Sequence, residues 1–170
     1  MMLRTLLTRI LVDGSVLTVI VATVLVGILY FNPRLALSDY PPDVKAAVAP
    51  RTKQEFRLGL LIAVPLLVIF VALPFRSLWL IKQHSGGVLS FWAAFATIAG
   101  EYLLFSLFDL IVLDVWMFFT WTPKFLVLPG TEGMASYKNW RPHAKAQLLQ
   151  GNAVLAVAAA ALAFIATQIL

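Results

Sequence analysis

The sequence predicts an all-α integral membrane protein whose single domain is a bundle of four transmembrane helices. Hydrophobic residues make up 61% of its 170 residues and charged residues only 12%, whereas soluble domains contain roughly 45–50% apolar and about 25% charged residues. Four apolar stretches each reach the ~20 residues that a transmembrane helix requires. Their apolar residues are continuous and lack the alternation of a membrane β-strand. The composition therefore excludes an ordinary soluble enzyme and a disordered chain.

The first predicted span covers residues 10–31 and carries one acid, Asp13, near its start. Arg4 and Arg9 precede it, as basic residues precede the core of a signal peptide. Its apolar run is longer than the ~7–15 residues of such a core. We therefore expect an uncleaved membrane anchor.

A proline-rich loop, residues 32–55, connects the first span to the second span, residues 56–81. Proline at this density favours an extended and solvated connection, and a strip that docks a partner is the alternative. Arg76 lies near the far end of the second span, where its side chain can extend to the headgroups or pair with an acid on the third span. Arg76 and Asp13 are the candidates for ion pairing inside the membrane.

The third predicted span, residues 88–119, carries the main functional signal. It contains no lysine or arginine but three acids, Glu101, Asp109 and Asp114. A carboxylate at the bilayer centre costs roughly 2.5–3.5 kcal/mol on insertion scales, so such residues usually face the bundle interior or a water-filled cavity and mark functional sites. As a helix the stretch is ~48 Å long, against a hydrocarbon core of ~30 Å. We therefore expect it to tilt, protrude or bend, with Gly100 as the weak point.

The spacing of these acids limits what one helix can build. In an α-helix Asp109 and Asp114 lie about 140° apart around the axis, so this helix alone is not expected to form a carboxylate pair. Glu101 and Asp109 lie about 80° apart around the axis and ~12 Å apart along it. These two can line one wall of a cavity but cannot share a proton.

Loop three, residues 121–151, is predicted to cap the end of the third helix. It brings a carboxylate, an imidazole and several basic side chains to the membrane face at which that helix ends. Carboxylates with an imidazole suit a divalent metal, but no spacing of a known metal motif supports one. Salt bridges between the acids and the basic residues are the interpretation that the sequence favours. The candidate ligand-binding residues are Glu101, Asp109, Asp114, Glu132, His143, Lys138 and Arg141.

The last predicted span, residues 152–170, is rich in alanine. Ala156 with Ala160, and Ala159 with Ala163, have the small-xxx-small spacing that lets helix backbones approach closely. We expect this face to pack inside the bundle, and packing between subunits is the alternative.

Four spans place loops one and three on the same side of the membrane. These loops and their edges carry nine basic residues, against four on the other side, which predicts loops one and three in the cytoplasm and both termini outside. The basic segment before the first span argues for the opposite orientation. His84 and His143, the only two histidines, fall on opposite faces, so a haem or copper site that needs two histidines is not expected. The absence of cysteine excludes disulfides and iron–sulfur clusters.

Four short segments stand out near the end of the third span: Leu107–Asp114, Thr122–Lys124, Pro129–Gly133 and Tyr137–Lys138. Together they resemble a group of small, uncharacterised bacterial four-helix membrane proteins of about this length. The resemblance covers residues 106–151 and leaves out the first two spans. It implies a location in the bacterial inner membrane. It also implies that the end of the third helix and loop three form one structural unit. It implies no activity.

Three functions are compatible with these features. The sequence favours a non-catalytic subunit or oligomer-forming module of a membrane complex, with an acid-lined polar patch on the third helix. An alternative is a module that binds or transports a cation, a proton or a lipid headgroup along Glu101 and Asp109. A second alternative is an enzyme that acts on a lipid at the membrane interface through Asp114, Glu132 and His143. No cofactor is expected. The expected partners are the lipid bilayer and other membrane subunits or a second copy of the chain, and nucleic acid is excluded because the basic residues lie beside the spans.

Overall fold

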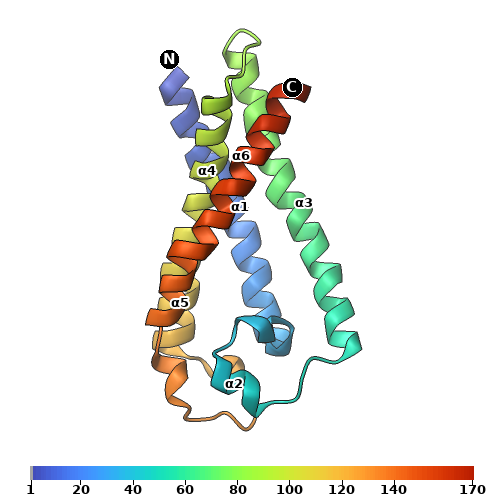
Figure 1. Cartoon of the computed structure of the whole chain (residues 1–170), viewed down its shortest axis with the longest axis vertical. Helices are drawn as coiled ribbons and strands as arrows, with labels where there is room; N and C mark the ends of the chain where they lie inside the picture. The colour runs from blue at the N-terminus through green and yellow to red at the C-terminus, as the bar shows by residue number, and fades with distance from the viewer. Residues whose placement is uncertain (1) are drawn as a thin grey trace.

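The computed structural model describes residues 2–170, and these residues form helices joined by loops, without a β-strand. Four helical stretches are long and apolar enough to cross a membrane, and they run up and down as one bundle (Figure 1). The predicted all-α four-helix architecture is confirmed. The stretches are α1 (Met2–Phe31), α3 (Lys53–His84), α4 (Phe91–Phe108) continued by η2 (Asp109–Trp121), and α5 (Arg141–Ala146) continued by η5 (Gln147–Gly151) and α6 (Asn152–Ile169).

The helix ends differ from the predicted spans because local capping, and not hydropathy, fixes them. Helix α3 begins at Lys53, directly after a capping box in which Thr52 accepts a hydrogen bond from the Glu55 N–H and Glu55 accepts one from the Thr52 N–H. The fourth helical stretch begins at Arg141 with a proline in its first turn, well before the predicted start at residue 152. Loop three is therefore shortened to residues 122–140.

Close contact between α1 and α4 explains two glycines. Helix α4 runs unbroken through Gly100, the predicted weak point. A Cβ atom at Gly100 would lie 2.9 Å from Ile10 Cδ1, and a Cβ atom at Gly14 would lie 3.2 Å from Glu101 Cα. The missing side chains therefore allow the two helices to approach closely, so Gly100 is a packing position and not a bend.

The core of the bundle lies along α4, which packs against both α1 and α6. Leu17 of α1 and Ile98 of α4 are fully buried. Ala159 and Ala163 of α6 are also fully buried and belong to the same cluster. The predicted pair Ala159 and Ala163 thus packs inside the bundle. In the other predicted pair, Ala156 is exposed and Ala160 is only partly buried.

Helix α3 departs from this close packing. Near its upper end, Leu78 and Ile81 are buried against the other helices. Toward Lys53 the helix diverges from α1 and α4 (Figure 1), and only 6% of its most apolar window is buried. The divergence leaves the lower half of the bundle open between α3 and the α5 and η5 segments.

Loops one and three fold into a cap at the lower end of the bundle. Loop one forms η1 (Pro33–Asp39) and α2 (Pro42–Ala47), and loop three forms η3 (Lys124–Leu126) and η4 (Ala135–Lys138). Their apolar side chains share one buried cluster, so the expectation that loop one is an extended, solvated linker is wrong. Its hydrophobic residues, unlike its prolines, decide its structure.

The Tyr40 hydroxyl ties the two halves of the cap together. It donates a hydrogen bond to the backbone oxygen of Leu126 at 2.8 Å. Burial raises the pKa of this hydroxyl well above its usual value, and the nearby Tyr137 and Asp39 raise it further. Tyr40 is therefore a neutral hydrogen-bond donor at any physiological pH.

Candidate functional site

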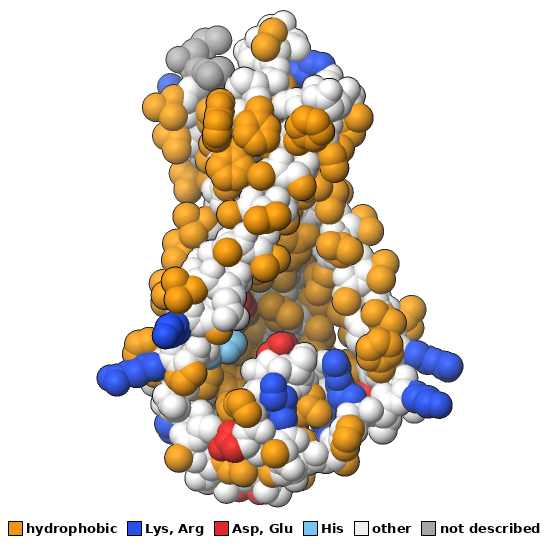
Figure 2. Space-filling model, viewed as in Figure 1, with side chains coloured by type: hydrophobic (Ala, Val, Ile, Leu, Met, Phe, Trp, Pro, Cys, Tyr) orange, Lys and Arg blue, Asp and Glu red, His pale blue; other side chains and the backbone are white. Residues whose placement is uncertain are grey.

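A cavity of about 670 Å³ lies in the lower half of the bundle, between the diverging α3 and the other helices. Helix α1 contributes Leu25, Ile28 and Leu29 to its wall, and η2, α5 and η5 contribute the side opposite α3. Figure 2 shows the corresponding hollow between α3 and the lower part of the fourth helical stretch, with histidine and acidic atoms at its lower end. The cavity is therefore open sideways, at a level where the surrounding helix surfaces are apolar.

Most of the cavity wall is hydrocarbon, but one end is polar. Leu60, Leu66, Leu113 and Phe118 are among the apolar lining residues. The ionisable and amide side chains that line the cavity are Asp39, Tyr40, Arg51, Asp109, Asp114, His143, Gln147 and Gln150. A pocket with apolar walls and a few converging polar groups is the usual form of a small-molecule site.

The helix that carries Asp109 and Asp114 is a π-helix. Residues Asp109–Trp121 form η2, and its backbone pattern is seen where the Thr122 N–H donates to the Met117 oxygen, five residues earlier. Hydrogen bonds from i to i+5 bring residues five apart close to one face. Asp109 and Asp114 are five residues apart, and both line the cavity. The expectation that the two residues lie on different faces, which assumed α-helical geometry, is therefore wrong.

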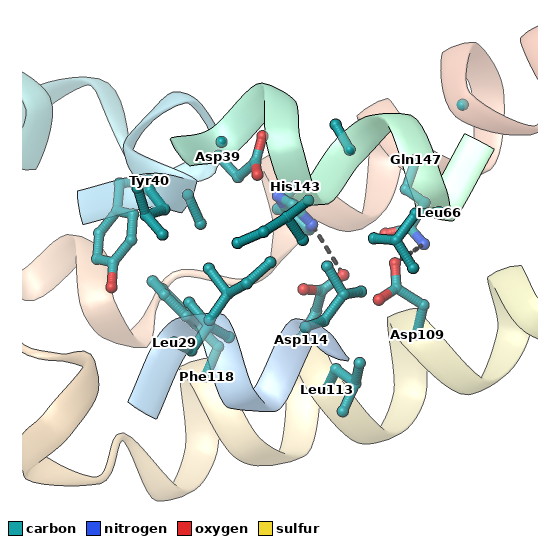
Figure 3. A pocket seen from close by; sticks show the side chains of 18 of the residues that line it. Leu29, Asp39, Tyr40, Leu66, Asp109, Leu113, Asp114, Phe118, His143 and Gln147 are labelled. Carbon is teal, nitrogen blue, oxygen red and sulfur yellow. Dashed lines mark hydrogen bonds and ion pairs between the residues drawn. The ribbon is translucent and has the colours of Figure 1, made fainter. Parts of the chain in front are cut away.

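Two side chains from the fourth helical stretch hold these carboxylates. His143 Nε2 lies 2.9 Å from Asp114 Oδ2, and Gln147 Nε2 donates to Asp109 Oδ2 at 3.0 Å. Both pairs are visible in Figure 3. Because a carboxylate only accepts hydrogen bonds, Nε2 of His143 carries the proton, and Nδ1 is free to accept one when the ring is neutral.

Loop one supplies a third carboxylate and a guanidinium. Asp39 lines the cavity and acts electrostatically on Asp109 and His143. Arg51 also lines the cavity, and its Nη1 donates to the backbone oxygen of Leu35 at 3.0 Å. The cavity lining therefore has more acidic than basic groups, namely three aspartates against one arginine and one histidine.

Sequence reasoning missed Asp39, Arg51 and Gln147. Gln147 follows His143 by four residues, so the helical spacing could have placed both side chains on one face. Asp39 and Arg51 gave no such signal, because their position depends on how loop one folds back over the bundle.

Three predicted site residues lie elsewhere. Glu132 accepts a hydrogen bond from the Gly130 N–H at 2.9 Å and shapes an exposed turn. Lys138 donates to the Thr120 oxygen and to Thr122 Oγ1 at the end of η2. Arg141 is exposed in the first turn of α5.

Their placement removes two expected arrangements. Among residues 2–170, the ion pairs that form do not involve Lys138, Arg141 or Lys145, so the expected salt-bridge network is wrong. Within the same residues no group of three or more His, Cys, Asp or Glu could hold a metal ion. Glu132 does not join Asp114 and His143, so the three-residue arrangement expected for an interfacial enzyme does not form.

A second polar cluster lies in the upper half of the bundle. Arg76 Nη1 lies 2.7 Å from Asp13 Oδ1, and Ser77 Oγ donates to Asp13 Oδ2 at 2.9 Å. Arg76 thus pairs with an acid on the first span and not on the third. Glu101 is fully buried on α4 beside this cluster and does not line the cavity, so it does not share a wall with Asp109.

Comparison of the chain with protein-family models, curated proteins and solved structures finds no match.

Proposed function

We propose that the chain is a membrane-embedded binding module that takes a lipid-like amphiphile from the bilayer into the cavity between α3 and the other helices. The polar head of the amphiphile would lie against Asp109, Asp114 and His143, and its chain would lie along α3. The observation that carries the proposal is the cavity itself, which has hydrocarbon walls, one polar end and a sideways opening.

The shape of the site favours an amphiphile over a simple ion. A bare cation needs a compact cage of oxygen ligands, and the described residues contain no such cage. The volume of about 670 Å³ lies within the roughly 300–1,000 Å³ of small-molecule pockets. Leu60, Leu66 and Phe118 offer a contact surface for hydrocarbon, which an ion does not use.

The charges of the site favour a head that carries an amine. Three aspartates line the polar end, and carboxylates accept hydrogen bonds from ammonium groups. Arg51 also lines the cavity and can contact a phosphate, since guanidinium matches phosphate geometry. We therefore expect an aminophospholipid, such as phosphatidylethanolamine, to bind better than an anionic phosphatidylglycerol of the same chain length.

A direct test fills the cavity without disturbing the fold. Gly59 of α3 lines the cavity, and a Cβ atom there would meet nothing within 4 Å. Gly59→Leu should therefore fold normally and reduce the binding of phosphatidylethanolamine at least several-fold. Native mass spectrometry of the detergent-solubilised protein with added phosphatidylethanolamine or phosphatidylglycerol measures the bound fraction.

The matched control is Gly27→Leu, since Gly27 lies on α1, also has open space around its Cβ position, and does not line the cavity. A second pair of variants tests recognition of the polar head of the lipid. Asp109→Asn should weaken binding of the amine lipid, whereas Asp43→Asn should not, because Asp43 is an exposed residue on α2. Equal lipid binding by the Gly59→Leu and Gly27→Leu variants would show that the cavity is not the site.

The second candidate function is a non-catalytic subunit of a membrane complex. The observation that favours it is the poor burial of α3 within the chain, because a partner helix could occupy the gap that α3 leaves. Native mass spectrometry after gentle extraction from the source membrane distinguishes the two. A discrete protein partner or a fixed oligomer supports the subunit function, and a single chain that carries one lipid supports the binding module.

We also propose that the protein resides in the inner membrane of a bacterium. The support for this location is the resemblance carried by residues 106–151, together with four helices long enough to span a bilayer. Fractionation of the source cells, followed by detection of the chain in the inner-membrane fraction, tests it.

A further inference from the structure

Glu101 is a buried carboxyl group without a hydrogen-bond partner. Its side chain is fully buried in α4, and neither Oε1 nor Oε2 has a hydrogen-bond partner. An ionised carboxylate without a partner is among the most costly groups to bury. The cavity function does not use this residue, because Glu101 lies outside the cavity wall.

The charged and titratable groups around Glu101 come from the two helices that pack beside it. Helix α1 contributes Asp13 and Arg9, whose Nη1 lies 3.5 Å from Asp13 Oδ2, and α3 contributes Arg76. On α4 itself Tyr102 follows directly, and its hydroxyl donates to the Phe70 oxygen at 2.8 Å. Helix α6 carries no ionisable side chain between its ends.

Both guanidinium groups are directed at Asp13 and not at Glu101. Arg76 contacts Asp13 Oδ1 at 2.7 Å, Arg9 lies 3.5 Å from Oδ2, and Ser77 donates to Oδ2 at 2.9 Å. The positive charges of Arg9 and Arg76 are therefore both paired with the carboxylate of Asp13. An uncharged Glu101 fits this arrangement, and an ionised one does not.

We propose that Glu101 is a proton-binding site inside the membrane, with its carboxyl group protonated at neutral pH. A proton fits better than a metal ion, because hard divalent cations take about six or more oxygen ligands and the described residues contain no group of three or more His, Cys, Asp or Glu that could hold a metal ion. Release of the proton would leave two carboxylates beside one another.

Infrared spectroscopy with labelled glutamate tests the proposal without a mutation. The chain contains only three glutamates, Glu55, Glu101 and Glu132. Glu55 pairs with Arg34 at 2.6 Å, and Glu132 is exposed and accepts a hydrogen bond from the Gly130 N–H, so Glu101 is the one of the three that is buried without a partner. Incorporation of ¹³C-glutamate should therefore shift one carboxylic acid C=O band at pH 7, and the band should disappear when the pH is raised.

A variant assigns the band. Glu101→Gln, which imitates the protonated group, should remove the labelled band, and Glu132→Gln should leave it unchanged. Glu101→Gln should also unfold in detergent at about the same temperature as the unaltered protein at pH 7, and should lose less stability as the pH rises.

The proposal would be overturned if no glutamate carboxylic acid band were present at pH 7, or if the band persisted in Glu101→Gln. A rise in unfolding temperature with added sodium chloride that depends on Glu101, and that choline chloride does not reproduce, would also overturn it, because it would indicate a metal ion in place of the proton. None of these results depends on whether the cavity binds lipid.

Discussion

His143 on α5 holds Asp114 on η2 through a hydrogen bond of 2.9 Å that joins residues 29 positions apart. The bond connects the end of the third helical stretch to the start of the fourth at the polar end of the cavity. The His143 ring also lies against Phe119, with ring centroids 5.7 Å apart. The imidazole is thus held by one polar and one aromatic neighbour, both on η2.

Asp114 and His143 should be energetically coupled. Hydrogen bonds between helices in membrane proteins average about 0.6 kcal/mol and reach about 1.7 kcal/mol in double-mutant cycles. We expect a coupling of about 1 kcal/mol between Asp114→Asn and His143→Ala, because both side chains are partly buried. Thermal unfolding of both single variants and the double variant in detergent measures it. Additive effects of the two substitutions would show that the pair does not contribute to stability.

Tyr40→Phe should loosen the cap. The substitution removes the donor to the Leu126 oxygen and leaves a buried carbonyl without that partner, which costs about 1–3 kcal/mol. Tyr30→Phe is the control, since Tyr30 is 61% exposed at the end of α1. Limited proteolysis of loop one should be faster in Tyr40→Phe only. Equal cleavage of both variants would contradict the role of the Tyr40 hydroxyl.

Gly14→Ala should separate α1 from α4. The new Cβ would lie 3.2 Å from Glu101 Cα and 3.1 Å from Leu104 Cδ2, and overpacking of this kind costs about 1–3 kcal/mol. Gly27→Ala, on the same helix, meets open space and should be neutral or stabilising by up to about 1 kcal/mol. Unfolding temperatures of the two variants compare them. A Gly14→Ala variant as stable as Gly27→Ala would argue against the close helix contact.

The orientation of the bundle can be mapped with single cysteines, because the chain has none of its own. The distribution of basic residues predicts the cap in the cytoplasm and loop two outside. A membrane-impermeant maleimide should therefore label His84→Cys but not Asp43→Cys in intact cells, since both positions are exposed on opposite ends of the bundle. Labelling of Asp43→Cys alone would reverse the orientation, and labelling of both would contradict the four-span topology.

The four spans could be predicted because their apolar length leaves no other structure in a membrane. The start of α3 at Lys53 depends on the Thr52 and Glu55 cap, which an apolar count ignores but a capping pattern can reveal. Loop one was harder to predict. Its prolines indicate an extended chain, whereas Leu37 and Val44 are buried against loop three. A contact of this kind between distant segments leaves no periodic pattern in the sequence.

The candidate site was predicted in part. Asp109, Asp114 and His143 were expected at one membrane face, and all three line the cavity. Their geometry could not be predicted from the sequence, because the continuous apolar run does not distinguish a π-helix from an α-helix. Residues five apart lie close to one face in a π-helix but not in an α-helix. The cavity itself depends on the divergence of α3, which follows from packing among whole helices and not from the residues of α3 alone.

The sideways opening between α3 and the α5 and η5 segments changes the quantity that determines how much of the cavity is occupied. A molecule that enters through this gap passes from hydrocarbon to hydrocarbon and keeps its chain out of water throughout, so the cost of leaving the bilayer does not enter its binding equilibrium. Its occupancy then depends on its mole fraction among the surrounding lipids and not on its concentration in solution. Dilution of the sample with buffer would leave the cavity filled, whereas dilution with a second lipid would empty it.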